Sequence, residues 1–154
     1  TWWDILVKGV RGIITGRDDL VVPWVLERAG GTTFSDGASI GYATDKGLVA
    51  GALYDNFNGA NINISLAGEG RNWLNREFLW FLCYYPFEQL KVRRVTALIA
   101  ESNQASIKFS KHIGFVHEAT LENAHPSGDL LVYKMLKENC KWLNLKGNSN
   151  GKQI

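Results

Sequence analysis

Small polar side chains recur at helical spacing between residues 103 and 115, and they are the residues best placed to do chemistry. Asn103, Ser106 and Ser110 occupy positions i, i+3 and i+7, so on a helix their polar groups share one face. Asn103 can cap a helix N-terminus, and Gly114 is suited to end the helix. One interpretation is a polar face turned towards a ligand. The alternative is an ordinary amphipathic helix with a few tolerated serines.

A loop with two glycines, residues 67–73, is a second candidate. It follows a strand-like segment and leads into a long helical pattern. Backbone N–H groups at the start of such a helix can receive a phosphate group. Because most turns of this kind bind nothing, the loop by itself does not identify a phosphate site.

Both candidates depend on a predicted strand–helix–strand unit. Residues 61–66 alternate strictly between polar and apolar side chains, which is typical of a strand. Its polar face must contact either solvent or a binding cleft. Helical spacing holds over residues 74–85, and the apolar run 92–100 predicts a buried strand. Two parallel strands joined through a helix are therefore expected.

The other elements follow from periodicity and turn signals. The run 20–28 predicts a helix, although Pro23 lies inside it. The segments 45–47 and Asn58-Gly59 predict tight turns. The remaining predictions are strands over 38–44, 48–56, 115–121 and 129–135, a turn-rich connection over 122–128, a short amphipathic end over 136–143, and a strand or helix over 2–7.

The composition indicates one globular domain. The chain has 154 residues, of which 45% are hydrophobic and 21% charged, so we expect a single domain over residues 1–145 and a disordered tail over 146–154. A net charge of +2 argues against a nucleic-acid binder, and the basic run 91–94 is interpreted as a solvated loop-to-strand junction. No run approaches ~18 continuous apolar residues and no secretory signal is visible, so no membrane span is expected.

The cysteines and histidines do not form a metal-binding pattern. Cys83 and Cys140 lie far apart and match no zinc spacing. The three histidines are also dispersed. We therefore expect no metal site, and two reduced thiols in a cytoplasmic protein.

The order of predicted elements resembles the GNAT acetyltransferase superfamily, over roughly residues 17–136. The most specific part is Asn103, Ser106 and Gly114-Phe115, with Glu118 three residues further on. This subset is most similar to the branch of ribosomal-protein Nα-acetyltransferases and spermidine acetyltransferases, and parts of the chain also resemble small phage-encoded GNAT proteins. The resemblance implies an α/β (α+β) fold, with a mixed central sheet of about six or seven strands, a V-shaped splay between two parallel strands and about four flanking helices.

The resemblance also implies that acetyl-CoA binds in the V-shaped opening. The thioester would lie along the first parallel strand and the pyrophosphate on the loop after it. The cofactor-binding residues that the resemblance implies are Ile64, Leu66, Arg71, Asn72, Trp73, Asn103, Ser106 and Ser110. The chain departs from the family in this loop, where bulky residues follow Arg71 in place of glycines. Arg71 and Arg76 would then supply positive charge through their side chains.

For catalysis, the resemblance implies acetyl transfer to an amine by direct attack in a ternary complex. Many family members have a tyrosine where this chain has Ser110, and the Nα-acetyltransferase branch uses the serine matching Ser106 to meet the departing thiolate. The glutamate base of that branch aligns with His125, and an imidazole can take up a proton near neutral pH. The alternative is that His125 is a surface histidine in a turn. Glu101 and Glu118 are the other candidate bases, with Glu118 also suited to a structural or substrate-orienting role.

Two functions stay open at this point. One is an N-acetyltransferase whose partners are acetyl-CoA and an amine, which is a protein N-terminus, a lysine or a small amine such as a polyamine; a homodimer is compatible with this. The other is a GNAT-like binding or structural protein that has kept the fold and lost efficient CoA binding, which the glycine-poor loop would fit. A shared fold does not by itself establish activity.

Overall fold

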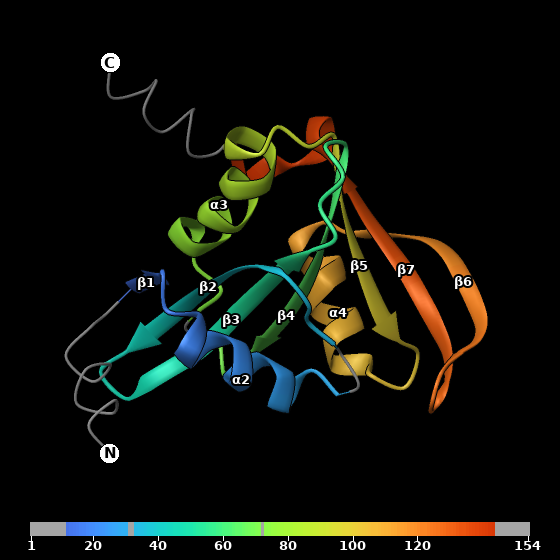
Figure 1. Ribbon diagram of the computed structural model, residues 1–154, viewed down its shortest axis with the longest axis horizontal. Coiled ribbons are helices and arrows are strands. Elements are labelled where there is room, and N and C mark those ends of the chain that lie inside the picture. The colour runs from blue at the N-terminus through green and yellow to red at the C-terminus, as the bar shows by residue number, and fades with distance from the viewer. Residues whose placement is uncertain (1–11, 31–32, 72, 144–154) are drawn as a thin grey trace.

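The computed structural model describes residues 12–30, 33–71 and 73–143. Within them the chain forms a seven-stranded sheet in the order β1-β2-β3-β4-β5-β7-β6 (Figure 1). Neighbouring strands are antiparallel except β4 and β5, which are parallel. The strands are β1 (Gly12–Thr15), β2 (Gly37–Thr44), β3 (Gly47–Asp55), β4 (Asn61–Gly68), β5 (Arg94–Ala100), β6 (Val116–His125) and β7 (Gly128–Leu136). The predicted fold class is confirmed.

The helices cover the sheet from both sides. They are α2 (Asp18–Arg28), α3 (Arg76–Tyr84), a π-helical turn that continues it (Tyr85–Gln89), α4 (Gln104–Ile113) and a 3-10 turn after β7 (Lys137–Asn139). Val21 and Val25 of α2 pack in one apolar cluster with Leu53 of β3. The residues on either side of Leu53 belong to the other cluster, with α3 and α4. Because successive strand residues point to opposite faces, α2 covers one face, and α3 and α4 cover the other.

The two parallel strands part in the middle of the sheet. Their pairing ends at Ile64 opposite Ala97. β4 nevertheless continues to Gly68 and β5 to Ala100, and the two arrows diverge over these ends in Figure 1. Backbone N–H and C=O groups need hydrogen-bond partners, so the diverging edges offer groups that a ligand can bind. The predicted V-shaped splay is present.

The connection predicted over residues 122–128 is a tight hairpin instead of a loop. β6 runs to His125 and β7 begins at Gly128. Asn123 has a φ of 57° and Gly128 a φ of 140°, conformations that Asn and Gly adopt more readily than other residues. The backbone N–H of Asn123 also donates to the carboxylate of Asp129 at 2.9 Å. The chain reverses at residues 126 and 127, and Asn123 lies where the register of β6 against β7 shifts.

The remaining described elements that the sequence predicted occur in the predicted places, and only their first or last residues differ. α2 begins at Asp18, before the predicted start at Leu20, and it accommodates Pro23 as an exposed residue in its interior. The turns predicted at 45–47 and at Asn58-Gly59 connect β2 to β3 and β3 to β4. The segments predicted at 2–7 and 146–154 lie outside the described residues. In the part of the chain that is described, no helix is long and apolar enough to cross a membrane.

Candidate functional site

The candidate site begins where β4 and β5 part. Ile64 is buried and Leu66 is half-buried. Both side chains lie on the side of α3 and α4, where they border a small apolar cavity. Their side chains therefore belong to the core, and a ligand that lies along this part of β4 would contact its backbone.

The loop between β4 and α3 is built around a buried tryptophan. Trp73 is 1% exposed, its ring centroid lies 4.7 Å from that of Phe109 in α4, and its indole N–H donates to the carbonyl of Gly70 at 3.2 Å. A Cβ at Gly68 would lie 2.2 Å from the Trp73 ring, so this close approach requires glycine. The loop therefore takes its shape from packing rather than from a run of glycines.

The predicted cofactor-binding residues of this loop fall in different environments. Arg71 is exposed, and Asn72 lies outside the described residues. The ring of Trp73 is enclosed by the core, so only its backbone is placed to meet a ligand. Asn75 caps α3 through its Oδ1 atom, which accepts the backbone N–H of Phe78 at 2.9 Å. One of the unpaired N–H groups at the start of α3 is thereby satisfied.

α4 displays the predicted polar stripe only in part. Asn103 caps the helix, because its Oδ1 atom accepts the backbone N–H of Ser106 at 3.1 Å, and Gly114 ends it with a φ of 123°. Ser106 is half-buried. Ser110, in contrast, is 2% exposed and lies on the buried face of the helix. Of the two serines, Ser106 is the one that a ligand could reach without rearrangement.

His125 is held at the end of β6 by the turn that follows it. The backbone N–H of Ser127 donates to His125 Nδ1 at 3.1 Å, and Ser127 Oγ lies 2.8 Å from the same nitrogen. Because Nδ1 accepts the backbone N–H, the proton of a neutral ring must be on Nε2. This Nε2 atom is buried and has no hydrogen-bond partner among the described residues. The ring is thus half-buried, and the hydrogen bonds of the turn restrain it. Both interpretations of His125, as a base and as a histidine in a turn, stay open.

A row of hydroxyl groups links His125 to the junction of β5 and α4. Ser127 Oγ lies 2.8 Å from Ser102 Oγ, and Glu101 and Ser102 directly follow β5. A hollow of about 370 Å³ beside them is lined by Glu101, Ser102, Gln104, Ser127, Gly128 and Asp129. Sequence reasoning missed Ser102 and Ser127, since only the hairpin brings them together.

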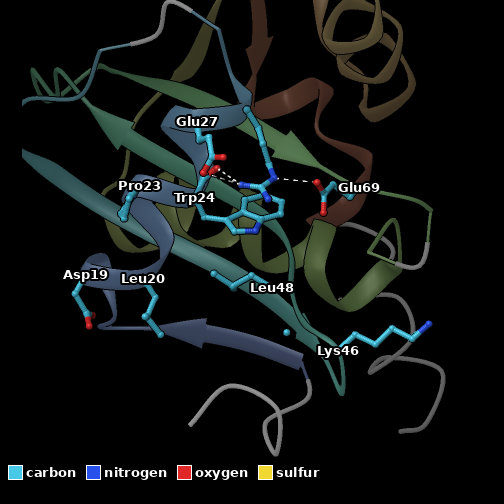
Figure 2. A pocket seen from close by; sticks show the side chains of 10 residues that line it. Asp19, Leu20, Pro23, Trp24, Glu27, Lys46, Leu48 and Glu69 are labelled. Carbon is cyan, nitrogen blue, oxygen red and sulfur yellow. Dashed lines mark hydrogen bonds and ion pairs between the residues drawn. The ribbon is translucent and has the colours of Figure 1, made fainter. Parts of the chain in front are cut away.

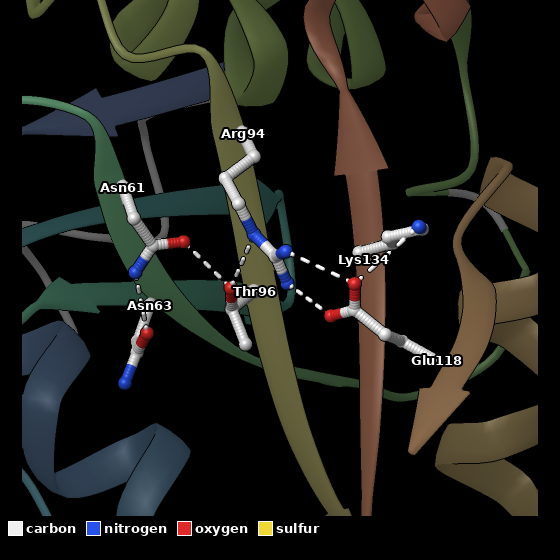
Figure 3. Close-up of polar contacts among 6 residues, drawn as sticks. All are labelled: Asn61, Asn63, Arg94, Thr96, Glu118 and Lys134. Atoms are coloured by element: carbon white, nitrogen blue, oxygen red, sulfur yellow. Dashed lines mark hydrogen bonds and ion pairs between the residues drawn. The ribbon is translucent and has the colours of Figure 1, made fainter.

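A polar network crosses the sheet on the same face as α2, over strands that α2 does not cover (Figure 3). Thr96 Oγ1 donates to Asn61 Oδ1 at 2.6 Å and accepts a hydrogen bond from Arg94 Nε at 3.1 Å. The Arg94 guanidinium donates to both oxygens of Glu118, at 2.6 and 3.2 Å. Lys134 Nζ lies 3.3 Å from the same carboxylate. The network therefore joins β4, β5, β7 and β6.

This network keeps Glu118 in its charged form. The hydrogen bond from Arg94 lowers the pKa of Glu118, burial partly opposes this, and Lys134 lowers the pKa further. A catalytic base must take up a proton, so Glu118 suits a structural role better than that of a base. The loop-to-strand junction predicted over residues 91–94 is present, since β5 begins at Arg94. The Arg94 side chain pairs with Glu118 across the sheet.

A groove of about 630 Å³ lies between α2 and the turn that joins β2 to β3 (Figure 2). The guanidinium carbon of Arg28 lies 3.9 Å from the ring centroid of Trp24. Arg28 Nε also donates to Glu69, in the loop after β4, at 3.0 Å. The positive charge of Arg28 is thus already satisfied, and the contact ties α2 to the loop.

The structure gathers part of the predicted site and separates the rest. Glu101 and His125 lie around the same junction, and Ser106 lies in the first turn of the helix that starts there. Arg71 lies in the loop at the end of the other parallel strand. Within the described ranges, no three His, Cys, Asp or Glu side chains could together hold a metal ion.

No protein-family model and no curated protein matches this sequence. Solved structures do share its fold. A "Probable acetyltransferase" is 22% identical, the match covers 67% of this chain and 63% of that chain, and the TM-score is 0.57. A variant of the spermidine N-acetyltransferase SpeG from Vibrio cholerae is 17% identical over 71% of this chain and 69% of that chain, with a TM-score of 0.58. The protein yncA from Salmonella typhimurium, solved with its cofactor acetyl-CoA, is 17% identical over 66% of this chain and 65% of that chain, with a TM-score of 0.55.

These matches show a shared fold. A GNAT-family acetyltransferase from Bacillus anthracis is also among the similar structures, so the chain has the GNAT fold. It spans about two thirds of the length of the solved chains described above, the smallest share being 63%. The narrower resemblance to ribosomal-protein Nα-acetyltransferases and to phage-encoded proteins stays a prediction.

Proposed function

We propose that the chain is an N-acetyltransferase that moves the acetyl group of acetyl-CoA to an amine by direct attack in a ternary complex. The observation that carries this proposal is the parting of β4 and β5 after Ile64 and Ala97. An exposed strand edge binds extended ligands through its backbone groups, and the pantetheine arm of acetyl-CoA is an extended chain with two amides. The yncA structure with acetyl-CoA supports the proposal.

The loop after β4 would hold the phosphate groups. Arg71 is exposed in this loop and can contribute a guanidinium, which suits phosphate oxygens. Backbone N–H groups at the start of α3 add favourable dipoles. The N–H group of Phe78 is an exception, because it already donates to Asn75 Oδ1. When bound, acetyl-CoA supplies an activated acyl group with a thiolate leaving group.

Ser106 is the residue proposed to meet the developing charge on sulfur. It lies half-buried in the first turn of α4, and its backbone is fixed by the Asn103 cap. A hydroxyl held in this way can donate a hydrogen bond to a thiolate without large reorganisation. Ser110 is too deeply buried to share this role in the present conformation.

His125 is the proposed base, acting through two hydroxyl groups. Since His125 Nδ1 has no proton of its own, Ser127 Oγ can donate to it, and Ser102 Oγ can donate to Ser127 Oγ. An amine in the hollow beside Ser102 would pass its proton to Ser102, Ser102 would pass its own to Ser127 Oγ, and Ser127 Oγ would pass its own to His125 Nδ1. Nδ1 would then no longer accept the backbone N–H of Ser127. Glu101 borders the same hollow and is the alternative base.

The acceptor proposed first is a small cationic amine of the polyamine type. Glu101 and Asp129 place two carboxylates at the rim of the hollow, and one of the similar structures is a spermidine N-acetyltransferase. A protein N-terminus or a lysine is the alternative acceptor. A cytoplasmic location and a homodimer stay predictions.

The test is binding followed by turnover. We expect millimolar acetyl-CoA to raise the melting temperature of the purified protein, since a ligand that binds only the folded state stabilises it. Added spermidine should then release free CoA thiol, and Ser106→Ala should slow this release about tenfold or more while keeping the thermal shift. Absence of any shift at millimolar acetyl-CoA would overturn the proposal.

A GNAT-fold protein without efficient catalysis is the second candidate. It is favoured by one observation, the buried Trp73 ring beneath Gly68, which fills space beside the strand that would hold the thioester. A thermal shift with acetyl-CoA and no thiol release with spermidine, a lysine peptide or a free peptide N-terminus would favour this candidate.

A further inference from the structure

The loop between β3 and β4 contains the pair Asn58-Gly59, at the end of β4 opposite to the candidate site. Both residues are exposed, so water reaches them. Among the asparagines of the described ranges, Asn58 is the one that glycine follows. Because glycine has no Cβ, the backbone nitrogen of Gly59 is less shielded than that of any other residue type in this place. A Cβ built on Gly59 would meet nothing within 4 Å, so the surroundings leave this nitrogen open as well.

The side-chain carbonyl of Asn58 is held by two backbone donors. Its Oδ1 atom accepts the N–H of Ala60 at 2.9 Å and the N–H of Asn61 at 2.8 Å. These bonds draw electron density away from the Cγ atom of Asn58. They would also stabilise a negative charge that develops on Oδ1 when a nucleophile attacks Cγ. The backbone of the loop therefore forms a small oxyanion hole around its own asparagine.

The groups that a reaction at Cγ would change are not held in place. In the part of the chain that the structure describes, neither the N–H of Gly59 nor the side-chain NH2 group of Asn58 donates to a protein acceptor. Gly59 also has a φ of 92°, a conformation that glycine adopts without strain. The nucleophile is thus free to lose its proton, and the leaving group is free to depart.

We propose that Asn58-Gly59 is a site of spontaneous covalent modification, at which the loop promotes closure to a succinimide. The nitrogen of Gly59 gives up its proton and attacks Cγ of Asn58, so that a C–N bond forms. The bond between Cγ and Nδ2 breaks, and Nδ2 takes up a proton and leaves as ammonia. One water molecule then opens the ring at either carbonyl, which gives an aspartyl or an isoaspartyl residue. This inference does not depend on the proposed acetyl transfer.

The two products differ in their effect on the fold. In the aspartyl product, a carboxylate oxygen can still accept the N–H groups of Ala60 and Asn61, and bonds to a charged acceptor are stronger. The isoaspartyl product runs the backbone through the former side chain and lengthens it by a methylene group, so the turn is lost. The carbonyl of Ala60 accepts the N–H groups of Arg93 and Arg94 at 2.8 and 3.2 Å. A displaced loop would therefore disturb the start of the parallel pair β4 and β5.

The experiment incubates the folded full chain in mildly alkaline buffer and follows it by peptide mapping with mass spectrometry. We expect Asn58 to react before every other asparagine of the described ranges. The expected masses are those of a transient product that has lost ammonia and of final products in which OH replaces NH2. Another described asparagine that reacts first would overturn the proposal.

The same measurement on the chain unfolded in guanidinium chloride tests the role of the loop. Unfolding removes the two N–H donors from Asn58 Oδ1. The folded protein should therefore react about tenfold faster or more, since donors to a developing oxyanion lower the barrier. A folded rate equal to or below the unfolded rate would show that the turn restrains the asparagine, and it would overturn the proposal.

Two kinds of variant test the nucleophile and the turn. Gly59→Ala adds a Cβ beside the attacking nitrogen and should slow the reaction about tenfold or more. It is measured in the unfolded chain as well, where the conformation of the loop has no influence, and an unchanged rate there would contradict attack by this nitrogen. Asn58→Asp reproduces the aspartyl product and should melt close to the wild type, whereas Asn58→Ala removes both bonds and should melt lower. Equal melting temperatures of these two variants would contradict the role given to the carboxylate.

Discussion

The two regions that flank the parting strands are built in opposite ways. The loop after β4 is shaped by apolar packing, with Trp73 enclosed between Gly68 and Phe109. The hairpin beside the end of β5 is shaped by hydrogen bonds, which run from His125 through Ser127 to Ser102. Packing contributes mainly to stability, whereas exposed hydroxyl groups such as those of Ser102 and Ser127 contribute little to stability and can move protons. We therefore expect mutations in the loop to affect folding and mutations in the hairpin to affect turnover.

The largest expected effect is that of Trp73→Ala. Removal of a fully buried tryptophan leaves a cavity in the core, and such losses typically cost about 3–5 kcal/mol of unfolding free energy. Urea denaturation followed by far-UV circular dichroism measures this. Trp73→Phe keeps most of the apolar volume and serves as the control. A loss below about 1 kcal/mol for Trp73→Ala would show that packing does not shape this loop.

The next effect should be that of His125→Ala, on turnover instead of stability. If His125 takes up the proton, its loss should lower kcat about 100-fold or more, while the melting temperature changes little because the side chain is at the end of a hairpin. Ser127→Ala is the matched control for the hydroxyl route. It removes the Ser127 hydroxyl but keeps the backbone N–H bond to His125 Nδ1. Activity unchanged in His125→Ala would remove this residue as the base and leave Glu101.

The smallest expected effect is that of Glu118→Gln, and it should depend on pH. Arg94 and Lys134 lower the pKa of Glu118 in the folded state. The ionised carboxylate therefore adds stability at pH values above its unfolded pKa of about 4.3, and this contribution disappears as the pH falls through the lower folded value. Melting temperatures of the two proteins should differ modestly at pH 7, and the difference should shrink as the pH falls below about 4.3. A difference that does not shrink with falling pH would mean that packing, not charge, is responsible.

The elements themselves were largely predictable from local patterns. The alternation over residues 61–66 predicted β4 and its two faces, since strand side chains point alternately to either side. Asn103 and Gly114 correctly marked the ends of α4, because capping depends on the residues at the ends. Residues 122–128 were predicted as a loop, since their turn-forming residues conceal a strand that pairing with β7 stabilises.

The site was less predictable, because contacts between distant residues decide it. Sequence spacing placed Ser106 and Ser110 on one helix face, and only the packing of α4 on the sheet buried Ser110 while leaving Ser106 accessible. No local sequence pattern marked Ser102 or Ser127 as part of a site, because the two residues that contact each other are far apart in the sequence. The same holds for Arg94 of β5 and Glu118 of β6, which form an ion pair across β7, the strand between them.

The sequence by itself determined the order of the elements and the strand–helix–strand unit, because hydrophobic periodicity and capping act over a few residues. The tertiary structure alone decided which polar groups meet: the hydroxyls beside His125, and the ion pair between Arg94 and Glu118. Such contacts depend on the order of the strands in the sheet and on the register in which neighbouring strands pair. No local pattern contains that information.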